Sequence, residues 1–144
     1  MRASLTLRYQ FSLDDDFGWL DAKVRAAGTG EAGGWWVQWQ DVEEWAAKLA
    51  ACPLAGPVEG DWGYGLAGEW ETVVGIWIEP AGEAGALDVR VTLADSDDPR
   101  IRFETGFRTR YPDLQRFAAA IGRMMKRKAG EAVLAGREPL DGKP

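Results

Sequence analysis

The chain has 144 residues, of which 46% are hydrophobic and 28% are charged, and its net charge is −6. This length and composition are typical of one globular domain with a substantial core, and they exclude wholesale disorder. Histidine is absent, which excludes Ser-His-Asp and Cys-His catalysis and the usual zinc sites, and a single cysteine, Cys52, excludes an internal disulfide. No apolar run reaches the roughly 18–20 residues of a membrane helix, so we expect no membrane contact. The lone cysteine favours the cytoplasm, and the missing histidine favours a protein without enzymatic activity. No cofactor is expected.

Alternating apolar and polar residues predict two strands near the N-terminus. Residues 5–13 alternate from Leu5 to Leu13, the run Asp14-Asp15-Asp16 interrupts the pattern, and residues 20–26 alternate again. The glycine-rich residues 28–34 predict a turn or a flexible loop. The aromatic residues 35–39 predict a short third strand.

Two helices are expected, with further strands between them. Asp41, followed by Glu44 three residues later, is typical of a helix start, and Pro53 ends that helical run. Residues 70–79, 87–93 and 101–107 each predict a strand, and a weaker glycine-broken piece surrounds residues 62–64. Pro112 and Asp113 open the second helix, which ends near Gly130.

The order of these elements is β-β-β-α, then a run of strands, then a helix. Such regular alternation indicates an antiparallel sheet with one face covered by helices. We therefore expect one α+β domain over residues 1–136, with about six strands and two helices packed on one face. Residues 137–144 are expected to form a flexible tail.

The charge is unevenly distributed along the chain. Residues 1–99 carry six basic and 18 acidic side chains, whereas residues 100–144 carry 11 basic and five acidic ones. An acidic body attracts basic partners through its field, although such charge also serves solubility. The basic face of the second helix favours a solvated surface over nucleic-acid binding, because the whole chain is acidic and no aromatic residues interleave the cations.

Several acidic and glycine-rich stretches contain residue types that occur at functional sites. Residues 14–16 and 95–98 offer oxygen ligands, but the second run lacks the glycine and glutamate of a calcium loop, so solvated turns are favoured. The run from Gly63 to Gly68 matches the letters of a dinucleotide fingerprint, but it precedes a strand instead of opening a helix, which excludes that site. An acid–base pair would have to come from four glutamates whose separation the sequence does not set: Glu69, Glu71, Glu79 and Glu83.

The eight tryptophans are the most informative feature of the composition. Trp45 lies on the apolar stripe of the first helix and is expected in the core. Trp19, Trp36 and Trp77 instead share strand faces with polar residues, on the side of the sheet away from the helices. The charged residues expected near them are Arg8, Arg90, Arg102 and Glu104. Two interpretations stay open: a tryptophan–arginine surface of the kind found at protein interfaces, or a second minor core if the sheet curls.

The order of several short motifs resembles that of the WapI-type immunity proteins. The motifs are Asp16-Phe17-Gly18-Trp19-Leu20 entering a strand, a Trp-rich strand before a short helix, Gly75 in a later strand, Leu93, Arg102-Phe103-Glu104, and Thr109-Arg110-Tyr111-Pro112-Asp113-Leu114 before the last helix. Together they cover roughly residues 5–125. The resemblance implies a cytoplasmic bacterial protein that neutralises the toxic C-terminal domain of a contact-dependent polymorphic toxin.

These observations predict a non-catalytic protein-binding module, in the manner of an immunity-like inhibitor that neutralises a toxin domain by direct binding. Trp19, Trp36 and Trp77 would anchor the partner. The charged residues expected at the same surface are Asp14, Asp15, Asp16, Glu71, Glu79, Arg102 and Glu104. Of these, the three aspartates, Glu71 and Glu79 would steer a basic toxin domain. The alternative is the binding of a small ligand or carbohydrate through exposed tryptophans, and carboxylate-based catalysis is least favoured. The oligomeric state stays open.

Overall fold

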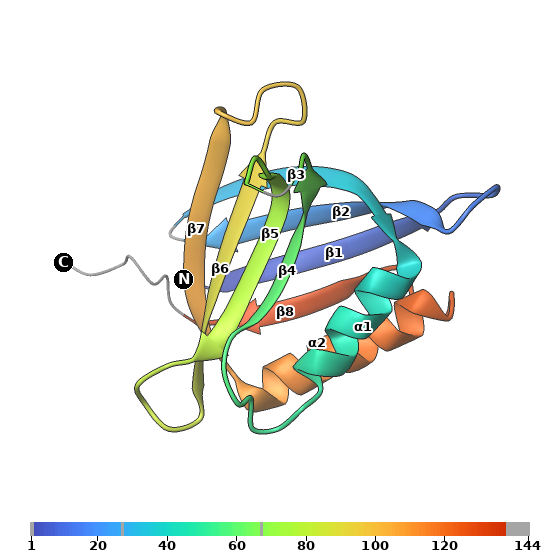
Figure 1. The fold of residues 1–144 in the computed structure, drawn as a ribbon. Helices are drawn as coiled ribbons and strands as arrows, with labels where there is room; N and C mark the ends of the chain where they lie inside the picture. The colour runs from blue at the N-terminus through green and yellow to red at the C-terminus, as the bar shows by residue number, and fades with distance from the viewer. Residues whose placement is uncertain (1, 27, 67, 138–144) are drawn as a thin grey trace.

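The computed structural model describes residues 2–26, 28–66 and 68–137. In chain order the elements are β1 (Ala3–Phe11), β2 (Phe17–Ala26), β3 (Thr29–Gln38), α1 (Trp39–Leu49), β4 (Val58–Tyr64), β5 (Glu71–Pro80), β6 (Ala86–Ala94), β7 (Arg102–Arg110), α2 (Tyr111–Met125) and β8 (Ala132–Gly136). Figure 1 shows two groups of strands that cross each other, with both helices gathered at one side. Neither helix has the length and apolar character needed to span a bilayer.

The strands form two four-stranded antiparallel sheets instead of one. The N-terminal sheet has the order β3-β2-β1-β8, and the central sheet has the order β4-β5-β6-β7. The α+β class with antiparallel strands is therefore confirmed, whereas the expected single sheet of about six strands is wrong. Alternation identifies the buried face of each strand, and that pattern is the same whether two strands share a sheet or face each other across a core.

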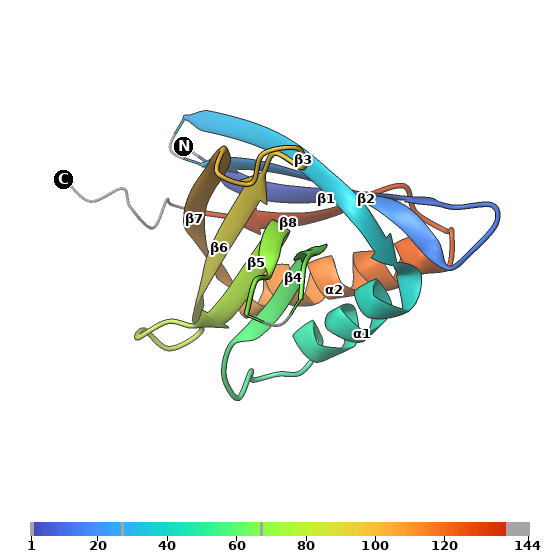
Figure 2. The ribbon, with the colours of Figure 1, turned by 45° about the horizontal axis from the view of Figure 1, so that its top comes forward.

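Both sheets turn their apolar faces to one shared core, which the two helices close from the side (Figure 2). Core side chains that are at most 1% exposed include Leu7, Leu20, Ile76 and Ile78. Helix α1 packs against α2 and β4, and α2 also packs against β7 and β8. Trp45 of α1 is buried as predicted, with its ring centroid 5.3 Å from that of Trp62 and 6.0 Å from that of Phe117. The helices thus pack against strands of both sheets and do not cover one face of a single sheet.

Both helices begin close to the predicted positions. Helix α1 begins at Trp39, and Gln38 precedes it without a side-chain cap bond, so Asp41 lies in the first turn and not at the cap. Helix α2 begins at Tyr111, with Pro112 and Asp113 in its first turn. In both helices an acidic side chain therefore faces the positive end of the helix dipole.

The glycine-rich stretch after residue 28 is the first half of β3, which corrects the predicted loop. Residues 29–38 pair with β2 along the full length of the strand. The glycines make room for neighbouring side chains: Gly34 lies beneath the ring of Trp19, and a Cβ at Gly33 would be 3.4 Å from Leu93 Cβ. Pairing with β2 thus outweighs the weak strand preference of glycine.

The strand β8 was not predicted from the sequence. The second helix ends at Met125, before the expected boundary, and β8 then pairs with β1 from Ala132 to Gly136. The backbone continues to Arg137, whose N–H donates to the Arg108 carbonyl oxygen at 2.9 Å. The rest of the expected tail, residues 138–144, lies outside the described residues.

Candidate functional site

The strand pairing of β2 and β3 places two tryptophans directly opposite each other. Trp19 pairs with Trp36, and their rings meet edge to face with centroids 5.1 Å apart and planes at 79°. Their neighbours Leu20 and Val37 are buried in the core, so the two rings lie on the outward face of the N-terminal sheet. The Trp36 side chain is 52% exposed, whereas Trp19 is half-buried. We call these two residues the tryptophan pair.

An apolar side chain that sequence analysis overlooked extends the tryptophan pair. Phe17 follows the same alternation as Trp19, pairs with Gln38, and is 41% exposed. The outward placement of Phe17 could have been predicted from the sequence, because residues 17 and 19 share a face when they belong to one strand. The outward face therefore carries three aromatic rings at one end of β2.

The three aspartates lie next to this aromatic end, in the hairpin between β1 and β2. Asp14, Asp15 and Asp16 are all exposed. Asp15 Oδ1 accepts the Phe17 N–H at 2.9 Å, and Asp16 Oδ2 accepts a bond from Gln40 Nε2 at 3.0 Å. The hairpin is therefore held against the start of α1, and Asp16 is about 10 Å along the chain from Trp19.

Tyr9 is affected by the charges of this hairpin and of the first turn of α1. Its hydroxyl donates to the Val37 carbonyl oxygen at 2.6 Å. Burial, followed by the negative charges of Asp15, Asp41 and Asp16, raises the pKa of Tyr9 from 10.0 to about 12. Three carboxylates thus act on one phenol, which shows that negative charge is concentrated at this end of the N-terminal sheet.

The other predicted residues gather on the central sheet. Trp77 of β5 is flanked by Glu59 of β4 and Arg90 of β6 on the outward face. Arg102 of β7 has one guanidinium nitrogen 3.9 Å from Glu71 and another 3.8 Å from Glu104. Glu79 lies opposite Asp88, which pairs with Arg108 at 3.2 Å.

A shallow hollow of about 270 Å³ opens on this face, above Gly75. Trp77, Thr72 and Thr92 form its walls, and Arg90 and Arg102 reach it from neighbouring strands. Asp61 at its rim accepts bonds from Thr72 Oγ1 at 2.7 Å and from Trp70 Nε1 at 3.0 Å. The missing side chain at position 75 thus leaves a polar recess beside one indole ring.

The predicted site residues consequently divide into two separate sets. The structure brings together Trp19, Trp36, Asp14, Asp15 and Asp16 on the N-terminal sheet, and Trp77, Glu71, Glu79, Arg102 and Glu104 on the central sheet. The three rings do not share one face, because the strands that carry them belong to different sheets. Over residues 2–26, 28–66 and 68–137, no three acidic or cysteine side chains come together as a metal site requires.

Comparison with known proteins gives no relative from which a function could be transferred. No family model matches the sequence, and neither a curated protein nor a solved structure matches it.

Proposed function

We propose that this protein is a non-catalytic binding module that docks another protein on the outward face of its N-terminal sheet. The observation that carries the proposal is the exposure of Trp36 while its ring is held edge to face against Trp19. A tryptophan that is rigid and open to solvent buries a large area on contact and loses little conformational freedom. Tryptophan is among the residues that contribute most of the binding free energy at protein interfaces.

The proposed partner is a basic toxin domain that the protein neutralises, in the manner of an immunity protein acting in the cytoplasm. The acidic hairpin beside the tryptophan pair supports a basic partner. Asp14, Asp15 and Asp16 are exposed there, and the charges of Asp15 and Asp16 add to the burial that raises the pKa of Tyr9. Charge of this kind increases the rate of encounter with a basic surface. The toxin-directed role itself derives from the resemblance to the WapI-type immunity proteins.

The test begins with a pull-down from the native cell, and the captured toxin domain is then expressed with and without the protein. We expect cell survival with the protein, a stable complex in gel filtration, and at least about tenfold weaker binding for Trp36→Ala in calorimetry. Trp77→Ala is the matched control, since it removes the same side chain from the other sheet and is expected to bind like the wild type. Unchanged affinity of Trp36→Ala would contradict the proposed docking face.

A second candidate function is the binding of a small polar ligand, such as a sugar ring, in the hollow above Gly75. An indole wall beside carboxylate, hydroxyl and guanidinium groups favours it. Glucose, galactose and N-acetylglucosamine can be titrated while tryptophan emission is recorded. A saturable change in emission that disappears in Trp77→Ala would support this function. Unchanged emission at tens of millimolar sugar would refute it.

A further inference from the structure

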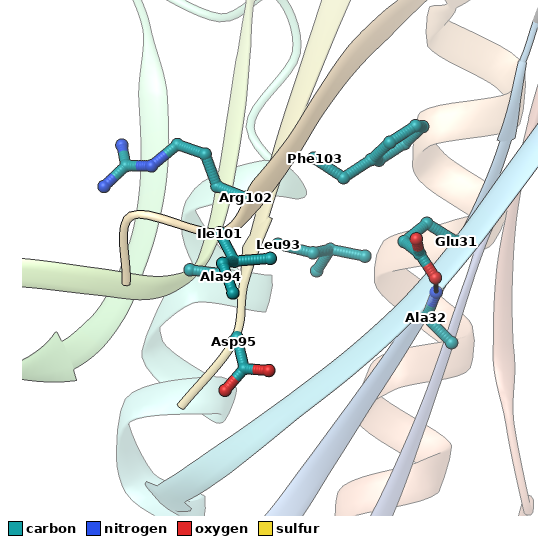
Figure 3. A pocket seen from close by; sticks show the side chains of 8 residues that line it. All are labelled: Glu31, Ala32, Leu93, Ala94, Asp95, Ile101, Arg102 and Phe103. Carbon is teal, nitrogen blue, oxygen red and sulfur yellow. Dashed lines mark hydrogen bonds between the residues drawn. The ribbon is translucent and has the colours of Figure 1, made fainter. Parts of the chain in front are cut away.

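A second recess lies between the two sheets, away from the tryptophan pair (Figure 3). Its volume is about 320 Å³, and its lining comes from β3 on one side and from the ends of β6 and β7 on the other. Leu93 and Phe103 form its floor, and Ile101 stands at its mouth with 62% of its side chain exposed. We call this recess the inter-sheet cleft.

The cleft is open because β3 is an edge strand. Strand β2 occupies one edge of β3, and the cleft follows the other edge, which no strand covers within the described part of the chain. The opposite side is fixed by backbone bonds: the Asp95 N–H donates to the Ile101 oxygen at 2.8 Å, and the Ile101 N–H donates to the Asp98 oxygen at 2.9 Å. These bonds hold Ile101 in place at the mouth.

The charges that face the cleft are negative. Glu31 lies on one side and Asp95 on the other, and neither forms an ion pair with any residue that the structure describes. Arg102 also lines the cleft, but its side chain turns away from the floor, as Figure 3 shows. Its guanidinium instead donates to the Pro99 carbonyl oxygen at 3.1 and 3.2 Å.

We propose that the inter-sheet cleft receives a lysine or arginine side chain of the partner protein. Such a side chain combines an aliphatic stem with a cationic head. The stem matches the apolar floor of Leu93 and Phe103 and the Ile101 side chain at the mouth. The head reaches Glu31 and Asp95, whose carboxylates have no competing cation among the described residues. This inference rests on the protein-binding function proposed above and adds the chemistry that the cleft recognises.

The charge can be removed without disturbing the local fold. Glu31 Oε1 accepts the Ala32 N–H at 3.2 Å, and Asp95 Oδ1 accepts the N–H groups of Asp97 and Asp98 at 2.8 and 3.3 Å. Glu31→Gln and Asp95→Asn keep an oxygen at each of these positions and lose only the negative charge. Glu43→Gln with Glu44→Gln, two exposed carboxylates on α1, provides a control with the same change of net charge.

The experiment uses the protein alone, so it is independent of the toxin assay. Three capped tripeptides, with lysine, norleucine or glutamate between two glycines, are titrated while backbone amide signals of Ala32, Leu93 and Phe103 are followed by NMR. We expect millimolar binding of the lysine peptide and weaker binding of norleucine, which has a similar stem but no charge. We expect no binding of the glutamate peptide. In the Glu31→Gln/Asp95→Asn variant, lysine-peptide binding should weaken by about two- to thirtyfold, as two exposed ion pairs imply.

Each result of the peptide titrations either supports or contradicts the cation site. Binding that weakens in the cleft variant, stays unchanged in the α1 control and declines with salt supports a cation site. Equal binding of lysine and norleucine would show an apolar groove and overturn the proposal, as would the absence of shifts at these three amides. Unchanged partner affinity of Trp36→Ala, with lysine-peptide binding at the cleft, would mean that the docking face is wrong and the cation site is not. Weakened partner affinity of Trp36→Ala, without lysine-peptide binding, would mean the reverse.

Discussion

The indole ring of Trp19 fills the space in which a side chain at position 34 would begin. A Cβ placed on Gly34 would lie 2.5 Å from Trp19 Nε1, which is closer than two unbonded atoms can approach. The absence of a side chain on β3 thus determines where the ring on β2 rests, and this ring in turn positions Trp36. The geometry of the tryptophan pair therefore depends on a glycine.

Gly34→Ala is expected to displace Trp19 and weaken partner binding, because the new methyl group and the ring cannot both fit. The free energy of unfolding should fall by about 1–3 kcal/mol, as for an overpacked site. Chemical denaturation monitored by tryptophan emission measures this change. Gly82→Ala is the control, since among the described residues a Cβ at Gly82 meets no atom within 4 Å; an equal loss there would refute the steric explanation.

Trp36→Ala and Trp45→Ala should differ sharply in stability. Trp45 is buried between Trp62 and Phe117, so its removal is expected to cost about 3–5 kcal/mol of unfolding free energy. Trp36 is half exposed, and its removal should cost under about 1.5 kcal/mol. Urea unfolding of both variants tests this difference. Comparable losses would mean that Trp36 belongs to a second core and is not an exposed anchor.

Tyr9 is expected to ionise much later than an ordinary tyrosine. Burial and the nearby aspartates raise its pKa from 10.0 to about 12 in the folded chain, whereas the unfolded chain has the ordinary value. Between these values the folded state holds a proton that the unfolded state has lost. The stabilisation linked to this proton is therefore complete below pH 10 and declines as the pH rises towards 12.

Absorbance at 295 nm during a base titration follows this ionisation directly. The wild type should show a late step near pH 12 that Tyr9→Phe lacks. Asp15→Asn should move this step to lower pH, because it removes one of the negative charges that oppose ionisation. A late step that persists in Tyr9→Phe would assign it to another residue.

Thr109→Val tests the contact that joins the two sheets between β7 and β8. The fully buried Thr109 hydroxyl donates to the Ala135 carbonyl oxygen at 2.6 Å. Valine removes this donor and leaves the carbonyl short of a partner, so the unfolding free energy should fall by about 1–3 kcal/mol. Hydrogen exchange should show faster opening of β8. Thr6→Val, at a half-buried position, is the control and should change either quantity little.

The strands and helices could largely be predicted, because each has a periodic pattern of its own. Leu5 and Leu7 alternate with polar residues, and Val42, Trp45 and Leu49 recur at helical spacing, as the structure confirms. The division into two sheets could not be predicted, since alternation does not identify pairing partners. Strand β8 was missed because its five residues form too short a run to stand out from a helix end.

The candidate site was only partly predictable for the same reason. The outward placement of Trp19, Trp36 and Trp77 follows from alternation within each strand. Their division between two faces depends on long-range pairing, which no local pattern records. The facing of Trp19 and Trp36 depends on the register set by the β2–β3 connection, where Ala26 pairs with Thr29. Because residues 28–34 were predicted to form a loop, the β2–β3 connection and its register were not predicted.

The exposed border of β3 has a consequence for how molecules of this protein behave in a crowded solution. The unpaired backbone groups of an edge strand can pair with a strand of a second molecule, and repeated pairing of this kind leads to fibres. Glu31 stands on that border, and joining two such borders would bring like charges together and strip them of water. One carboxylate on an otherwise glycine-rich border thereby helps to keep neighbouring copies apart.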